Sequence, residues 1–303
     1  MIWPTRGSAR RPEPRPEESR SGSRPVLIHA LDGFLGAGSA TSLAADQLRS
    51  GGDVVHEYDI DAMFDYRARR PTLAFRDNRY QDYDTPRLVI TREIDLNGTE
   101  FFLLSGPEPD FLWERFVRET VEQLDVLGVG LVLGLGAVPM GVPHTRPVMI
   151  TAHGTRPELV DRQNLWTADV TVPASAQAML EFRLGEMGRD AGGYVVHVPH
   201  YLAQFEFPDA ALALLEAIAD RTGLHLDTTQ LQARQEETRA QIEAQIIDQG
   251  GAEVLHGLEQ QYDAFARGAA QSLLAHDEEL PSGEELADQF EQFLAKQRKD
   301  DQS

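Results

Sequence analysis

One stretch near the start of the chain limits the fold more than any other. Residues 26–31 form an apolar run, Asp32 ends it, and a glycine-rich turn then leads to Ser39. A helix-like run follows directly over residues 40–48. A buried strand that enters a helix through such a turn is typical of a doubly wound α/β domain. The ligand crevice of such a sheet lies at the carboxyl ends of its strands, so we expect residues 32–39 to line it.

The rest of the pattern predicts a mixed sheet covered by helices. Buried strands are predicted at 53–58, 129–135, 148–152 and 194–198, and helices at 39–49, 111–127, 175–189 and 208–222. Two further strands, 87–94 and 99–105, meet at Asn97-Gly98, a dipeptide typical of hairpins. The sheet should therefore be mixed and not purely parallel. Residues 61–84 are polar with many aromatic side chains, which predicts a long ordered loop of the kind that often carries function.

Composition divides the chain into four parts. Residues 1–24 hold few large apolar groups, so burial cannot offset the entropy of ordering them, and we predict a disordered tail. Residues 25–225 form the α/β domain. Residues 226–298 are predicted to be an acidic helical C-terminal appendage that packs on the domain or on a neighbouring subunit, and residues 299–303 a frayed tail. The appendage has an apolar seam with steps of three and four residues, namely Leu255, Leu258, Tyr262, Phe265 and Ala269.

Composition also argues against several classes of protein. The chain has 303 residues, no cysteine and a formal net charge of −21. Without cysteine there are no disulfides, no thiolate catalysis and no cysteine-ligated metal. So acidic a surface repels phosphate, so we expect no nucleic-acid partner. No apolar run is long enough to cross a membrane and the N-terminal segment lacks a signal-peptide core, which predicts no membrane association and a cytoplasmic location.

The turn after the first strand has two interpretations. Its candidate binding residues are Asp32, Gly33, Phe34, Gly36, Gly38 and Ser39. Backbone amides at a helix start can hold an anion. However, the turn lacks the Lys-Ser/Thr of a phosphate-binding P-loop and the spacing of a dinucleotide fingerprint, and Asp32 puts a negative charge at its mouth. We favour a tight turn that needs small residues.

A second strand end, residues 134–147, carries a loop with two prolines and then His144, Thr145 and Arg146. His144 could act as an acid or base near neutral pH, and Arg146 could hold a carboxylate or phosphate through paired hydrogen bonds. Alternatively, the loop fixes a subunit contact, with Arg146 paired to a local Asp or Glu. We favour the contact because no nucleophile accompanies the loop. Arg156, after the next strand, is predicted to join the same crevice.

The remaining histidines do not combine into a reaction centre. His29 lies inside an apolar strand and is predicted to be a core histidine. His197 and His200 should point to opposite faces of the last strand, which suits a single metal ion poorly. The Gly-x-Ser-x-Gly elbow of many hydrolases is missing. We therefore expect no catalytic residues, no metal and no cofactor.

The Asp-Gly-Phe turn and the Gly-Ala-Gly-Ser helix entry within residues 26–39 resemble those of the PAC2 family, which is named for a proteasome assembly chaperone. The Val-Pro-His-Thr-Arg-Pro loop over residues 142–147 looks like that of its actinobacterial branch. The resemblance spans roughly residues 24–222. It implies a three-layer αβα fold with a mixed, mostly parallel sheet, similar to phosphorylase/hydrolase-like folds and usually self-associating.

The resemblance also implies a function. It predicts a non-enzymatic protein-interaction or proteasome-assembly-chaperone-like factor that acts as a homo-oligomer, with itself and possibly proteasome subunits as partners. Eukaryotic members dock on proteasome pockets through a hydrophobic-Tyr-any tail, and the sequence from Lys299 to Ser303 does not match it. The alternative is a nucleoside- or phosphate-type small-molecule binder or enzyme. Its crevice would be formed by residues 32–39, His144, Arg146 and Arg156.

Overall fold

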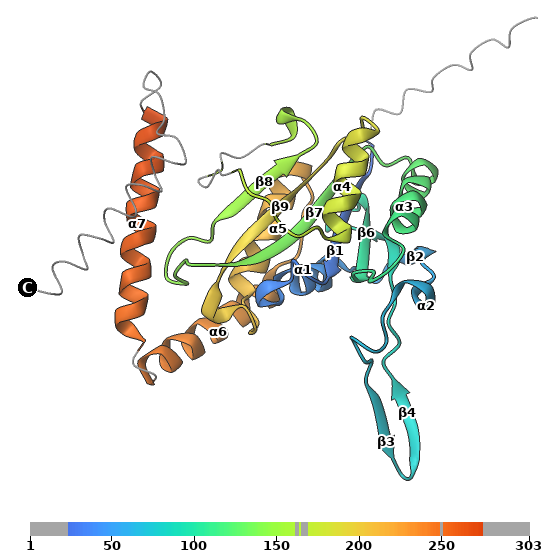
Figure 1. Cartoon of the computed structure of the whole chain (residues 1–303), viewed down its shortest axis with the longest axis horizontal. Coiled ribbons are helices and arrows are strands. Elements are labelled where there is room, and N and C mark those ends of the chain that lie inside the picture. The colour runs from blue at the N-terminus through green and yellow to red at the C-terminus, as the bar shows by residue number, and fades with distance from the viewer. Residues whose placement is uncertain (1–23, 161–163, 165–168, 249–250, 275–303) are drawn as a thin grey trace, which may run out of the picture.

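A seven-stranded sheet forms the centre of the molecule (Figure 1). The structure is a computed structural model that describes residues 24–160, 164, 169–248 and 251–274. The strands are β1 (Val26–Asp32), β2 (Asp53–Glu57), β5 (Val89–Ile94), β6 (Glu100–Pro107), β7 (Leu131–Met140), β8 (Ile150–Gly154) and β9 (Ala191–Pro199). The predicted N-terminal tail, apart from Arg24, and the predicted segment after residue 274 lie outside the described residues.

The sheet is mixed, as predicted. Its spatial order is β2-β5-β6-β1-β7-β9-β8. β1 pairs in parallel with both β6 and β7, and β7 pairs in parallel with β9. β5 and β8 run antiparallel to their neighbours. The hairpin at Asn97-Gly98 joins β5 to β6, and Gly98 there has a φ of +81°, which favours glycine.

Helices cover both faces of the sheet and complete three layers. α1 (Ala40–Leu48) and α5 (Pro208–Thr222) lie on one face, while α3 (Trp113–Leu127) and α4 (Ala176–Glu186) lie on the other (Figure 1). Successive side chains of a strand point to opposite faces, so β1 serves both layers. Ile28 packs in the core with α1 and α5, whereas its neighbour Leu27 packs in the core with α3 and α4.

The last strand differs from the prediction. Helix α4 ends at Glu186 and not at residue 189, and β9 begins at Ala191 and not at residue 194, so Gly192 and Gly193 lie inside the strand. A Cβ atom on Gly193 would come within 2.9 Å of Cε1 of His153 on the neighbouring strand. Gly193 therefore leaves room for the His153 side chain, a role that turn propensity does not reveal.

The C-terminal helices pack on the domain. They are α6 (Thr229–Asp248) and α7 (Ala252–Leu274). Leu231 and Ile242 of α6 are buried in the same core cluster as α5, and the buried carboxylate of Asp209 accepts a hydrogen bond from Gln235 at 2.9 Å. Within the described part of the chain, no helix has the length and hydrophobicity to cross a membrane.

The segment predicted as a long loop has secondary structure of its own. It contains α2 (Ile60–Met63) and a separate two-stranded hairpin, β3 (Leu73–Arg76) and β4 (Arg79–Tyr83). The hairpin stands away from the rest of the molecule, as Figure 1 shows. We call residues 73–83 the arm.

Candidate functional site

The turn after β1 is filled by a carboxylate of the chain itself. Glu108 accepts hydrogen bonds from the backbone N–H of Phe34 at 3.0 Å and from that of Ala176 at 2.6 Å. Because Ala176 is the first residue of α4, Glu108 also occupies the start of that helix. A Cβ atom on Gly33 would overlap the Glu108 side chain. The Phe34 amide is thus already used by Glu108, and the amides of Gly38 and Ser39 donate to the backbone oxygens of Ala203 and Gly36.

Close packing explains the glycines further along this turn. Gly38 has a φ of +65°, and a Cβ atom there would lie 3.0 Å from Cγ1 of Val198. Gly36 forms an isolated bridge with Ala137, which ties the turn to β7. Ser39 precedes α1, yet its side chain makes no capping hydrogen bond. This geometry fits a tight turn that needs small residues.

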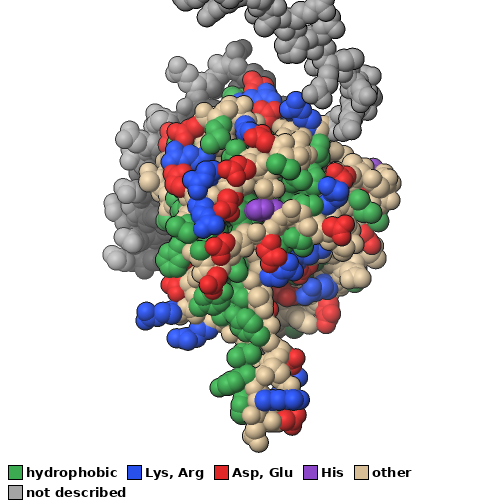
Figure 2. Space-filling model, turned by 90° about the vertical axis from the view of Figure 1, so that its right-hand side faces the viewer, with side chains coloured by type: hydrophobic (Ala, Val, Ile, Leu, Met, Phe, Trp, Pro, Cys, Tyr) green, Lys and Arg blue, Asp and Glu red, His purple; other side chains and the backbone are tan. Residues whose placement is uncertain are grey.

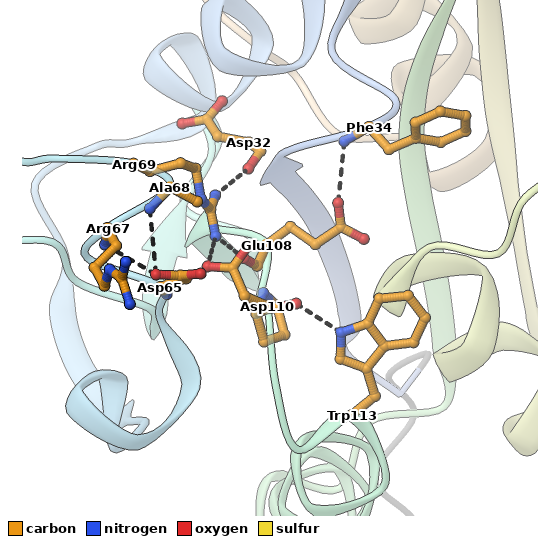
Figure 3. Close-up of polar contacts among 10 residues, drawn as sticks. Asp32, Phe34, Asp65, Arg67, Ala68, Arg69, Glu108, Asp110 and Trp113 are labelled. Atoms are coloured by element: carbon orange, nitrogen blue, oxygen red, sulfur yellow. Dashed lines mark hydrogen bonds and ion pairs between the residues drawn. The ribbon is translucent and has the colours of Figure 1, made fainter.

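Arg69 holds the base of the arm segment against this turn. Its Nη2 donates hydrogen bonds to the backbone oxygen of Glu108 and to Oδ2 of Asp110, both at 2.5 Å. Its Nη1 lies 3.4 Å from the backbone oxygen of Asp32 (Figure 3). The guanidinium also lies over the Phe64 ring, 4.6 Å from the centroid. These contacts fix where the arm leaves the domain.

The arm exposes apolar side chains that have no cover in the described chain. Phe75 and Tyr80 are 60% and 72% exposed, and their ring centroids lie 5.1 Å apart. Leu73 and Tyr83 at the other end of the hairpin are exposed as well. Figure 2 shows hydrophobic side chains continuing from the body along one side of the projection. An isolated two-stranded hairpin is marginally stable in water, so such a strip is suited to contact another surface.

The loop between β7 and β8 is held by α7. Arg146 donates from Nε and Nη2 to the two carboxylate oxygens of Asp263, both at 2.8 Å. Thr145 donates to Glu259 at 2.5 Å, and the Tyr262 hydroxyl donates to the backbone oxygen of Pro147 at 2.9 Å. The guanidinium lowers the pKa of the Asp263 carboxyl. Arg146 therefore pairs with an acidic residue, as one interpretation proposed, but that residue is distant in the sequence.

His144 also makes hydrogen bonds within the protein. Its backbone N–H donates to the Tyr201 hydroxyl at 3.0 Å, and its Nδ1 lies 2.8 Å from the same oxygen. The ring is buried, and this burial lowers the pKa of His144, which favours the neutral form at physiological pH. The His144 ring thus has a structural partner in Tyr201, which follows β9. These contacts do not include a serine, threonine or cysteine nucleophile.

The prediction that Arg156 joins this edge of the sheet is wrong. β8 runs antiparallel to β9, so its last residue, Gly154, lies opposite Gly192 near the start of β9. Arg156 accordingly lies at the other end of the sheet, where it donates two hydrogen bonds to Asp190 at 2.8 and 2.6 Å. The crevice expected from residues 32–39, His144, Arg146 and Arg156 is not assembled as a unit.

Three histidines instead lie on the α4 face of the sheet. His29 on β1 is buried, and this burial lowers its pKa to about 4. His153 on β8 has Nδ1 at 2.9 Å from Glu181, and His197 on β9 has Nε2 at 2.9 Å from Thr151. Among the residues that the structure describes, no three His, Cys, Asp or Glu side chains group closely enough to hold a metal ion.

The family model for PAC2 matches residues 30–246. The chain belongs to the PAC2 family. The matched region runs from the last residues of β1 into α6, so it includes the other strands of the sheet, both helical layers and the arm. Helix α7, which holds the β7–β8 loop, lies beyond it.

Several solved structures are similar to this chain. A Mycobacterium tuberculosis protein of unknown function, Rv2714, is 43% identical with a TM-score of 0.78, covering 82% of this chain and 88% of its own. A Corynebacterium glutamicum protein of unknown function is 34% identical with a TM-score of 0.77, covering 86% and 98%. The M. tuberculosis proteasome-assembly chaperone homologue Rv2125 is 25% identical with a TM-score of 0.68, covering 73% and 95%. No curated protein matches the chain.

The sequence did not mark two residues that organise this region. Glu108 and Arg69 connect the first turn, α4 and the segment that leads to the arm, but no sequence pattern indicates their partners. The high aromatic content of residues 61–84 singled out the segment that contains the arm, but it did not indicate a hairpin.

Proposed function

We propose that this PAC2 chain is a non-enzymatic protein-binding factor of the proteasome-assembly-chaperone kind, which acts as a homo-oligomer through its arm. The observation that supports this most is the exposed aromatic strip of the arm. Phe75 and Tyr80 expose apolar area to water, and burial of this area against a matching protein surface is favourable.

The charge of the arm favours a second copy of the chain as the occupant. The whole chain carries a formal net charge of −21, so two copies repel each other over most of their surfaces. Within the arm, by contrast, Arg76 and Arg79 balance Asp77 and Asp82. Contact through this neutral strip therefore brings two acidic chains together with the least repulsion.

The state of the polar residues supports a non-enzymatic role. Glu108, Arg146 and Arg156 each have partners within the chain that satisfy their hydrogen bonds. A catalytic site would need such groups to converge on an open position. We therefore take the nucleoside- or phosphate-type crevice as the weaker candidate.

A structural neighbour suggests the proteasome as the partner to test. Rv2125, a 25% identical structural neighbour, is described as a proteasome-assembly chaperone homologue. Membership of the same family makes proteasome subunits the first partners to test.

The test is a pull-down of purified proteasome subunits from an actinobacterium with the full chain as bait. The wild type should retain them, and a Phe75→Ser/Tyr80→Ser variant should retain fewer because it loses the oligomer that the arm joins. Val126→Ser on α3, whose side chain is 77% exposed, is the matched control and should behave as the wild type. No retention by the wild type would contradict the proteasome role, and equal retention by all three would contradict a role of the arm-joined oligomer in that binding.

A further inference from the structure

A large cavity lies on the α4 side of the sheet and is separate from the arm. Its volume is about 910 Å³, within the usual range for small-molecule sites. It extends over the ends of β7, β8 and β9 and along α4. Its walls include Phe34, Met140, His153, Phe182, Val195 and His197.

The cavity begins beyond the glycines of β7. Leu133 and Leu135 of this strand are buried against α5, and Gly134 and Gly136 alternate with them on the α4 side. Other side chains already cover these glycines, because a Cβ atom on Gly134 would lie 2.6 Å from Cε1 of His29 and one on Gly136 would lie 3.4 Å from Cδ1 of Leu35. The open space starts further along the strand, where Val138 and Met140 line the cavity.

Four of the polar side chains that line the cavity form two hydrogen-bonded pairs. His153 Nδ1 lies 2.9 Å from Oε1 of Glu181, which projects from α4. On β9, His197 Nε2 lies 2.9 Å from the Thr151 hydroxyl. The remaining lining is mainly aliphatic and aromatic, from side chains such as Val138, Val172 and Phe182. A ligand that fits must be largely hydrocarbon with a polar group at one end.

Charge decides which polar group fits. Glu181 and Glu186 line the cavity, and none of the described lining residues is Lys or Arg. Arg183, which is not a lining residue, already pairs with Glu186 at 2.6 Å, so Glu181 is the acidic group that a ligand meets. A carboxylate, sulfate or phosphate would therefore meet acidic groups without a permanent positive charge to balance it. We propose that the cavity binds a small, mainly hydrophobic molecule that is neutral or cationic, such as an arylamine, with its polar end at the Glu181–His153 pair. This site goes beyond the protein-binding function and does not depend on it.

The matched fluorescent probes N-phenylnaphthylamine and anilinonaphthalene sulfonate test this proposal. They share one aryl skeleton and differ by a sulfonate, so their comparison isolates charge. Titration of the full chain should show saturable binding of the neutral probe at one site per chain. The sulfonate should bind at least about tenfold more weakly because it faces Glu181. No saturable binding of the neutral probe, or equal affinity for the two, overturns the proposal.

Two variants locate the probe. Ala178→Trp places a large ring into the cavity from the exposed surface of α4 and should weaken neutral-probe binding at least about tenfold. Val126→Trp on exposed α3 is the control and should change nothing. Glu181→Gln keeps the side-chain size and should narrow the affinity gap between the two probes by about fivefold.

The same variants can also contradict the proposal. If the probe binds Ala178→Trp as tightly as the control, it lies elsewhere and the proposal is wrong. Circular dichroism checks that each variant is folded. If Ala178→Trp does not fold, Glu181→Gln decides, because an unchanged difference in affinity between the probes rejects the Glu181–His153 pair as the site of the polar group.

Discussion

The arm and the cavity both expose apolar side chains, but their shapes call for different partners. The arm is a projecting two-stranded hairpin that the domain holds at its base through Arg69. The cavity is concave and lies between the sheet and α4. A projecting strip can be covered only by the surface of another protein, whereas an enclosed volume is filled best by a small molecule. Exposed apolar area by itself therefore does not indicate the kind of partner. The shape of that area, projecting or concave, does indicate it.

The two regions also differ in charge and titratable groups. The arm holds equal numbers of Arg and Asp residues and no histidine. The cavity wall holds His153 and His197, and the buried His29 lies on the same face of the sheet. Changes of pH and substitutions can therefore act on one region while leaving the other unchanged.

The largest expected effect concerns His29 and acid. Its pKa is about 4 in the folded protein against an ordinary 6.5, because burial disfavours the charged ring. Below pH 6.5, His29 binds a proton in the unfolded chain but not in the folded one. The contribution of His29 to the free energy of unfolding is therefore fully present above pH 6.5 and is lost as the pH falls from 6.5 to about 4. Going from about pH 7.5 to about pH 5 should remove about 2 kcal/mol of unfolding free energy through this residue.

Urea unfolding of the wild type and of His29→Gln at these two pH values measures that effect. The variant should lose less stability on acidification, while His200→Gln, an exposed histidine, should behave as the wild type. Self-association through the arm should not follow the same change while the domain stays folded. An identical pH dependence in wild type and His29→Gln would contradict the account of this face.

A smaller effect compares two adjacent valines of β9. Val196 is fully buried against the α5 layer, and Val195 lines the cavity. Val196→Ala should cost about 1.5 kcal/mol because it removes packed methyl groups. Val195→Ala should cost clearly less because its methyl groups already border empty space. Equal losses in urea unfolding would mean that the cavity face is as well packed as the other face.

The smallest expected effect concerns α7. Arg146→Gln removes the paired hydrogen bonds to Asp263 and should speed amide hydrogen exchange across α7 with little change in the melting temperature. The exposed pair Arg87–Glu57 at the other edge provides the control, since Arg87→Gln should leave α7 unchanged. The variant's mass in solution should equal that of the wild type. A lower mass would show that α7, and not the arm, carries the subunit contact.

Local sequence patterns predicted the parts of the fold that depend on local physics. Periodicity and turn residues predict the strand–turn–helix unit that begins with β1, the hairpin at Asn97-Gly98 and helix α5. The direction of β8 does not, because a strand pattern is the same in both directions, and Arg156 was misplaced for that reason. The same limit hid the reason for Gly193, whose neighbour across the sheet is far away in sequence.

The candidate site was predictable only in part for a related reason. The sequence singled out the loop with His144 and Arg146, and one interpretation paired Arg146 with a local Asp or Glu. Its partner Asp263 lies on a helix 117 residues further along the chain, and charge pairing leaves no periodic trace. The arm was missed because the positive φ values of Asp77 and Asn78, which close its turn, come from residue types that are also common in loops.

Analytical ultracentrifugation of the full chain tests the central claim that the arm joins copies of the protein. The account predicts that the wild type sediments as an oligomer and that Phe75→Ser/Tyr80→Ser weakens its association at least about a hundredfold, with the Val126→Ser control unchanged. A wild type that stays monomeric at high concentration, or a double variant that associates as the wild type does, would contradict it.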